Sequence, residues 1–137
     1  MKHLLVLLFV LVIAGLAAGC AGAPPTPSPV PAQPGEGPPG PVYVEETDLL
    51  LLESYPVQVR LVVRGNLPTP CHQARWEVSG PDDSGRIDVE LYSTAPEDRA
   101  CIQVLASFEE DIPLGSHERG QFTVWLNGEQ VQAFQLP

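Results

Sequence analysis

The sequence predicts a small all-β domain, a β-sandwich of about seven strands, behind an export signal and a proline-rich linker. Three observations support this prediction. Apolar and polar residues alternate with period two in several short runs, and turn-forming residues separate those runs. No stretch of useful length shows the 3.6-residue period of an amphipathic helix. Short strands without helices indicate two packed sheets.

Length and composition limit the class of protein. The chain has 137 residues, 16 prolines, 12 glycines and a formal net charge of −10, which is enough material for one domain. Apolar residues are crowded into residues 4–18, and nine prolines lie in residues 24–41. Residues 42–137 are therefore the part expected to bury a core. These numbers exclude a multidomain enzyme, a polytopic membrane protein and a basic nucleic-acid binder.

The first residues have the features of an export signal. Lys2 and His3 precede an uncharged apolar stretch over residues 4–18, and small residues close the segment. Fifteen helical residues would span about 22 Å, less than the roughly 30 Å hydrocarbon core of a bilayer. We expect residues 1–19 to be a signal peptide.

The end of this signal resembles the lipobox of bacterial lipoproteins, in the run Leu16-Ala17-Ala18-Gly19-Cys20. The resemblance implies cleavage before Cys20 and a diacylglycerol on its thiol, with fatty acids such as palmitate. It also implies anchoring in the cell membrane or outer membrane, with the domain on the extracytoplasmic side. The alternative is an ordinary cleavage site, in which Cys20 has no role.

Residues 20–41 are predicted to be a disordered linker. Proline fixes φ and lacks a backbone donor, so nine prolines in this segment exclude helix and sheet and favour an extended spacer. Such a spacer would hold the domain away from the membrane. A proline-rich ligand for a partner domain is the alternative interpretation.

Two cysteines remain after Cys20. An exported protein meets an oxidising compartment, so Cys71 and Cys101 are predicted to form a disulfide. The alternative is a metal site made from these thiols with His72 and His117, but neither histidine shows the spacing that prearranges zinc ligands. The sequence predicts no metal and no cofactor.

Strands are expected wherever apolar residues alternate with polar ones. The expected strands are residues 48–53, 57–63, 76–78, 87–91, 102–106, 122–126 and 130–135. Four consecutive leucines in residues 48–53 suggest an inner strand. Turns are expected at 65–68, 80–85, 95–98 and at Asn127-Gly128, where a type I′ turn requires positive φ at both residues.

The domain resembles the immunoglobulin-like fold in the broad sense, although Trp76 follows Cys71 more closely than in true immunoglobulin domains. Residues 56–59, 65–71, 108–115, 122–124 and 127–128 also resemble a group of exported bacterial domains, often lipoproteins, that have no established activity. That resemblance covers most of residues 44–136. It supports the β-sandwich and implies no functional residue.

The turn at Asn127-Gly128 predicts a candidate binding face. A regular hairpin would place Val124 opposite Val131 on the core face. The outer face would then carry Trp125, Thr123 and Phe134 together. Exposed aromatic residues often mark contacts with partners, so these three are the predicted partner-binding face. The alternative is that another segment covers them.

The sequence predicts a binding module of unknown ligand rather than an enzyme. It contains none of the common nucleophile, zinc-protease or nucleotide-binding motifs, and both His72 and His117 fall in expected loops. An envelope or extracellular protein is the expected partner, and nucleic acid is not expected because the chain is acidic. One alternative function is inhibition of exported proteases by an acidic loop, either residues 109–113 or residues 81–85. A calcium loop at residues 82–88 and a hydrolase using either histidine are further alternatives.

Overall fold

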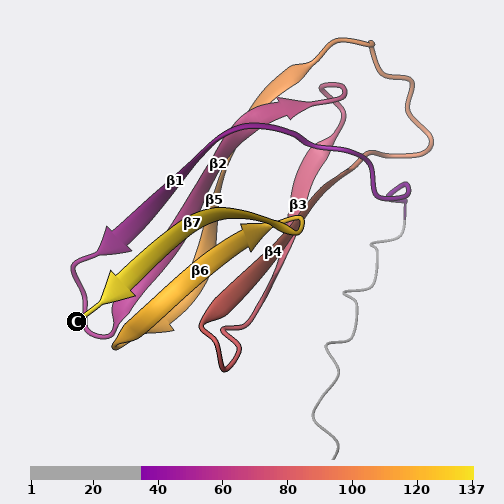
Figure 1. The fold of residues 1–137 in the computed structure, drawn as a ribbon. Helices are drawn as coiled ribbons and strands as arrows, with labels where there is room; N and C mark the ends of the chain where they lie inside the picture. Colours follow the sequence, from indigo (N-terminus) through magenta and orange to yellow (C-terminus); the bar gives the residue numbers. More distant parts are fainter. Residues whose placement is uncertain (1–34) are drawn as a thin grey trace, which may run out of the picture. The chain divides into compact units, whose positions relative to one another are not determined.

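Two β-sheets packed face to face form the domain in the computed structural model, which describes residues 35–137 (Figure 1). The predicted signal peptide, Cys20 and most of the predicted linker lie outside the described residues. The strands are β1 (Tyr43–Leu52), β2 (Val57–Leu67), β3 (Gln73–Ser79), β4 (Arg86–Thr94), β5 (Ala106–His117), β6 (Gly120–Leu126) and β7 (Glu129–Leu136). One sheet has the order β1-β2-β5 and the other β3-β4-β6-β7. The prediction of an all-β sandwich with seven strands is confirmed for this part of the chain.

The core lies between the two sheets and is built from the predicted alternating runs. Each of these strands presents a row of aliphatic side chains to the interior and polar side chains to solvent. The buried members of the core are Val59, Leu61, Val63, Ile87, Val89, Leu91, Ile112, Leu114, Val124 and Leu126. Each such side chain contributes roughly 1.5–3 kcal/mol by leaving water.

Two of the predicted turns are confirmed in detail. Asn127 and Gly128 have φ values of 49° and 84°, as a type I′ hairpin turn requires. Residues 80–85 connect β3 to β4, and Asp82 organises this turn by accepting hydrogen bonds from Ser84 and from the backbone N–H of Arg86 at 2.9 Å. The bonds from Ser84 and Arg86 lower the pKa of Asp82 below its ordinary value.

The predicted disulfide is present. Cys71 and Cys101 are joined with a Cα–Cα distance of 6.0 Å, which lies within the ordinary range. The bond connects the loop after β2 with the loop after β4. Neither thiol is therefore available as a metal ligand.

Two local assignments from the sequence are wrong. The strand expected at residues 102–106 is an irregular, largely exposed loop, and the real strand β5 begins at Ala106 and ends at His117. The acidic segment 109–113 lies inside this strand and is not a loop. Residues 65–67 belong to β2 rather than to a turn: Gly65 and Asn66 pair with both β1 and β5, and Leu67 pairs with Ala106 of β5.

The leucine-rich strand lies at the edge of a sheet, so the prediction of an inner strand is wrong. β1 pairs with β2 alone, and Leu50, Leu51 and Leu52 are exposed. A run of leucines indicates apolar surroundings on both faces, but it does not say how many neighbouring strands are present.

The domain begins earlier than residue 42. Gly37 donates a hydrogen bond to Ala95 O at 2.8 Å, and Gly40 and Ser93 exchange two backbone hydrogen bonds. Glu36 forms an ion pair with Arg75. The segment 36–41, predicted as linker, is therefore attached to the end of β4 and to β3.

The second sheet departs from the immunoglobulin pattern. β4 and β6 are neighbours and run parallel, with Ile87 paired to Val124, whereas immunoglobulin sheets are antiparallel. Antiparallel neighbours β3 and β7 complete this sheet. The resemblance to immunoglobulin domains therefore holds for the two-layer architecture but not for this pairing.

Candidate functional site

A β-bulge at Val131 separates the residues of the predicted binding face. Val124 pairs with Gln132, not with Val131 as expected, so Val131 is an extra residue in β7. Every residue of β7 beyond the bulge therefore points to the opposite side from the one predicted. Phe134 pairs with Phe122 on the core side, whereas Trp125 and Thr123 lie on the outer side.

Trp125 is partly covered by a charged side chain rather than free. The Arg86 guanidinium lies 4.0 Å from the centre of its ring, and its indole Nε1 donates to Thr123 Oγ1 at 3.1 Å. The same guanidinium makes two hydrogen bonds to Asp88, at 2.8 and 2.6 Å. These bonds lower the pKa of Asp88 and raise that of Arg86. Trp125 and Arg86 thus form a compact cluster whose charge is paired within the domain.

Phe134 belongs to an aromatic cluster at one end of the core. Its ring stacks on Phe122 with centroids 4.9 Å apart, and His117 lies 4.7 Å from Phe122. His117 is buried at the end of β5, so its prediction as a loop residue is wrong. Its Nε2 lies 3.2 Å from Leu114 O. His72 is in a loop, as predicted, with Nδ1 2.8 Å from the Thr69 hydroxyl.

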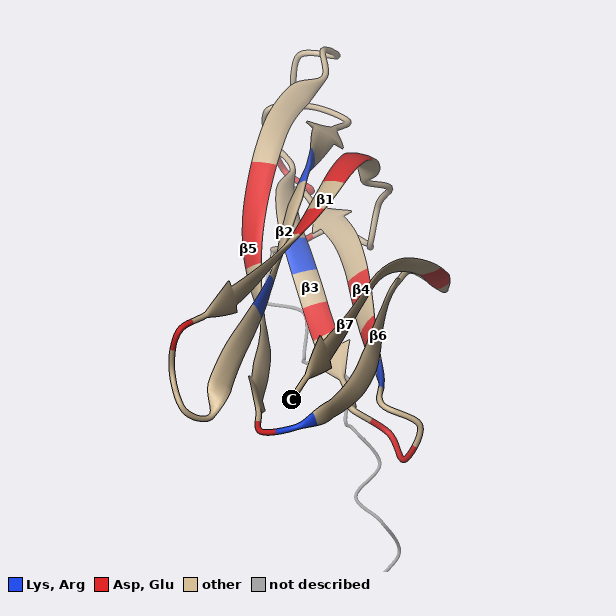
Figure 2. Cartoon of the chain, turned by 60° about the vertical axis from the view of Figure 1, so that its left-hand side comes forward, with Lys and Arg blue, Asp and Glu red and all other residues tan. Residues whose placement is uncertain are grey.

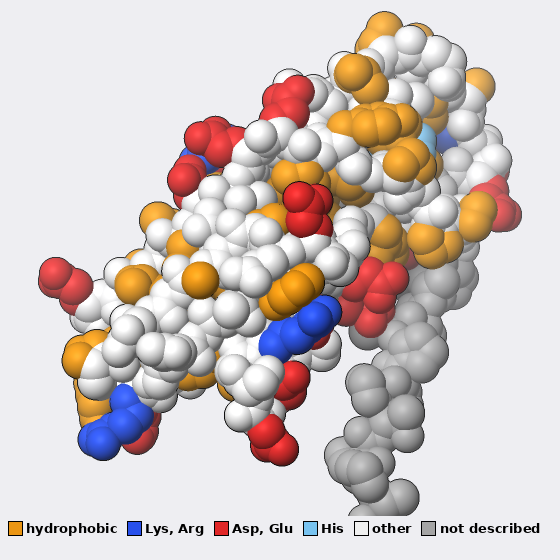
Figure 3. All heavy atoms as spheres, viewed as in Figure 1, with side chains coloured by type: hydrophobic (Ala, Val, Ile, Leu, Met, Phe, Trp, Pro, Cys, Tyr) orange, Lys and Arg blue, Asp and Glu red, His pale blue; other side chains and the backbone are white. Residues whose placement is uncertain are grey.

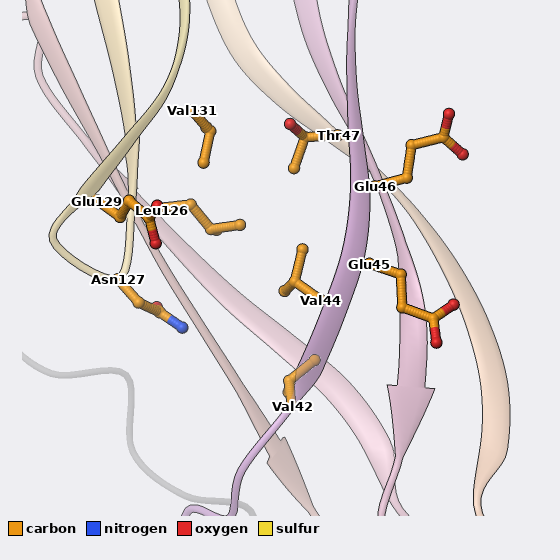
Figure 4. Close-up of a pocket in the computed structure, with 9 residues that line it drawn as sticks. All are labelled: Val42, Val44, Glu45, Glu46, Thr47, Leu126, Asn127, Glu129 and Val131. Atoms are coloured by element: carbon orange, nitrogen blue, oxygen red, sulfur yellow. The ribbon is translucent and has the colours of Figure 1, made fainter.

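A groove with a mixed polar and apolar lining lies where the edge strands β1 and β7 face each other (Figure 4). It has a volume of about 360 Å³. Val42 and Val44 point into it from the β1 side, and Leu126 and Val131 line it from β6 and β7, as Figure 4 shows. We call this feature the β1–β7 groove.

The bulge also shapes one end of the β1–β7 groove. Because of the extra residue, Gln132 turns toward β1, and its Nε2 donates to Thr47 O at 2.9 Å and to Thr47 Oγ1 at 3.3 Å. This contact joins the two edges at one point. Beyond it, toward Val42 and the turn at Asn127, the edges remain apart and the groove is open.

Three glutamates contribute to the lining of the groove at its margins. Glu45 and Glu46 point away from it on β1, and Glu129 stands at the opposite rim (Figure 4). Arg64 on β2 binds Glu46 at 3.4 Å and Asp48 at 2.8 Å. Acidic side chains outnumber basic ones over the visible surface in Figure 3. A ligand of the groove would therefore meet a few aliphatic side chains among polar groups, within an acidic surface.

Sequence reasoning missed the groove. Val42 and Val44 are more than 80 positions from Leu126 and Val131, and only the packing of the two sheets brings them together. The local sequence around the start of β1 contains two β-branched residues, Val42 and Val44. Such a pair is typical of any short strand and does not indicate a groove.

Residues 61–136 match the family model of the ORF11 beta-sandwich domain. The chain belongs to this family. The match begins within β2 and ends with the last residue of β7. In this member of the ORF11 beta-sandwich family, the β6–β7 wall of the groove lies inside the match and the β1 wall lies before it. Neither the curated proteins nor the solved structures include a match to the chain.

The remaining candidate chemistry finds no support in the described part of the chain. Across residues 35–137, no cluster of three or more His, Cys, Asp or Glu residues is placed to hold a metal ion. The same residues contain no helix of the length and apolar character needed to cross a membrane.

Proposed function

We propose that this protein is a lipid-anchored extracytoplasmic lipoprotein whose β-sandwich is a non-enzymatic binding module. The lipobox resemblance at Cys20 supports the anchor. The Cys71–Cys101 disulfide supports an oxidising compartment outside the cytoplasm.

The β1–β7 groove is the observation on which the binding role rests. Apolar side chains converge there between two sheet edges, and an edge strand offers unpaired backbone donors and acceptors. Extended peptides commonly bind in this way, with backbone hydrogen bonds to the edge and side chains in pockets. We therefore propose an extended segment of an envelope protein as the ligand. Its apolar side chains would contact Val44 and Val131, and a flanking basic residue would face Glu129 at the rim.

Substitution of one groove residue tests the binding role. Val44→Glu places a carboxylate among the aliphatic side chains of the groove, and Leu105→Glu makes a comparable change at an exposed loop position outside it. Full-length chains would be cross-linked in intact cells and purified, and the captured proteins compared by mass spectrometry. We expect a protein retained by the wild type and by Leu105→Glu to be lost from Val44→Glu. Equal capture by Val44→Glu would refute the groove as the binding site.

The anchor has its own test. Cells would be grown with a radiolabelled fatty acid, and the wild type compared with Cys20→Ser. We expect label on the wild type only, because Cys20 supplies the thiol that carries the lipid. Absence of label from the wild type, or equal label on the variant, would refute the anchor and leave the groove proposal standing.

A further inference from the structure

The four edge strands of the sandwich are not equally protected. Free sheet edges tend to pair with other chains, and charged side chains, proline or bulges normally prevent this. β5 carries acidic residues at 109–111 and Pro113, β3 carries Arg75 and Glu77, and β7 has the bulge at Val131. Figure 2 shows the acidic band along β5. Each of these three edges therefore has at least one protective feature.

The second half of β1 differs from them. The first half has a bulge at Glu45, and the side chain of Gln132 already occupies the carbonyl of Thr47. Residues 49–52 are four leucines with no charge, proline or bulge. Leu50, Leu51 and Leu52 are 42%, 45% and 38% exposed on this edge. Such a strand has the composition of an inner strand and the position of an edge strand.

We propose that residues 50–52 of β1 pair in antiparallel orientation with the same residues of a second copy of this chain. The pairing would join the two three-stranded sheets into one sheet of six strands, with β1 and its counterpart at the centre. A two-fold axis generates such an interface from one self-complementary surface. The leucine segment would then have a neighbouring strand on both sides.

The register supports pairing with a second copy. With the two-fold axis at Leu51, Leu50 lies opposite Leu52 of the second copy, and opposed side chains point to the same side of the sheet. Asp48 then lies opposite Ser54 and Leu49 opposite Glu53, so no two carboxylates are directly opposed. The three leucines 50–52 are thus self-complementary in shape, and the register opposes no like charges.

The local charges are also compatible with close approach of two copies. Arg64 forms ion pairs with Glu46 and Asp48, the acidic residues nearest the leucines on the outer face. These contacts, together with those to Glu109, raise the pKa of Arg64 above its ordinary value, so the guanidinium stays charged. Longer-range repulsion between two acidic domains is screened beyond about 8 Å at physiological ionic strength.

A cysteine on the proposed two-fold axis tests the pairing in the full-length chain. In Leu51→Cys the two introduced thiols would lie on opposed residues, whose Cα atoms are about 4.5–5.5 Å apart in an antiparallel pair. A disulfide forms readily at that distance. Val104→Cys is the matched control, because Val104 is 51% exposed and lies in the loop before β5. The wild type shows how much cross-linking comes from Cys20.

Cross-linking would be measured in the cells that make the protein, by non-reducing electrophoresis and mass spectrometry. We expect at least tenfold more covalent dimer from Leu51→Cys than from Val104→Cys. We also expect the dimer to disappear when Leu50→Lys and Leu52→Lys are added to Leu51→Cys, because like charges would then oppose each other across the axis. Three results would overturn the proposal: equal dimer from the control, persistence of the dimer in the lysine variant, or cross-linking of Leu51→Cys to a different protein.

Discussion

Replacing both Cys71 and Cys101 by alanine is expected to lower the free energy of unfolding by about 3.7 kcal/mol. The two cysteines are 30 positions apart. In the chain-entropy treatment, closing a loop of that length reduces the conformational entropy of the unfolded chain, and this destabilises the unfolded state by about 3.7 kcal/mol. Domains of this size have total stabilities of about 5–15 kcal/mol. The bond would therefore supply a large share of the stability.

Urea unfolding followed by tryptophan fluorescence provides the assay. With a urea dependence of about 1.5 kcal/mol per molar, the loss would move the midpoint down by about 2.5 M. The wild type treated with a thiol reductant should show the same shift, and the double alanine variant should not respond to the reductant. A loss below about 1 kcal/mol in both experiments would show that the unfolded chain is not restricted by the bond, and would refute the reasoning.

Three further predictions concern the turn, an ion pair and the core. Asn127→Gly keeps the positive φ but removes two side-chain hydrogen bonds to the backbone of β4. Chemical unfolding should show that the free energy of unfolding falls by about 1–3 kcal/mol. A fall below about 0.5 kcal/mol would contradict this role of Asn127. The pKa of Asp88 is lowered by hydrogen bonds from Arg86. The contribution of Asp88 to stability is therefore present above the ordinary carboxyl pKa of about 3.9 and is lost as the pH falls through the folded-state value. Asp88→Asn should show a flatter fall in stability between about pH 5 and pH 2 than the wild type, and parallel curves would contradict the assignment. Leu61→Ala should lower the free energy of unfolding by about 3–5 kcal/mol, because the side chain is fully buried. Leu105→Ala, at an exposed site, should change it by less than about 0.5 kcal/mol. Similar losses in the two variants would refute the assignment of the core.

The strands that local sequence predicted well are those with one face toward the core and one toward solvent. Val59, Leu61 and Val63 lie on one face of β2, and the structure buries all three. Gln58, Arg60 and Arg64 lie on the other face, where Val62 is the apolar exception. The turn at Asn127-Gly128 was predictable for a similar reason, because its geometry depends on the φ preferences of two adjacent residues. In both cases the information lies within a few residues of the chain.

The candidate binding face failed because it depended on the register of a whole hairpin. One extra residue, Val131, reverses the direction of every later side chain in β7 and moves Phe134 to the core. Nothing in the residues around Val131 distinguishes a bulge from regular pairing. The β1–β7 groove was missed for a different reason, since its walls come from opposite ends of the domain.

The acidic residues of β5 show how composition and architecture are connected in this protein. Sequence reasoning predicted residues 109–113 as an acidic loop, but their position on an edge strand gives the acidic residues 109–111 a structural role. Charges there oppose pairing with another chain, and Glu109 also binds Arg64 of the neighbouring strand with an N–O distance of 2.6 Å. The second half of the other edge strand of the same sheet, residues 49–52 of β1, carries leucines instead. Because the two edges belong to one sheet and differ in this respect, association through this sheet should occur at β1 and should leave β5 free.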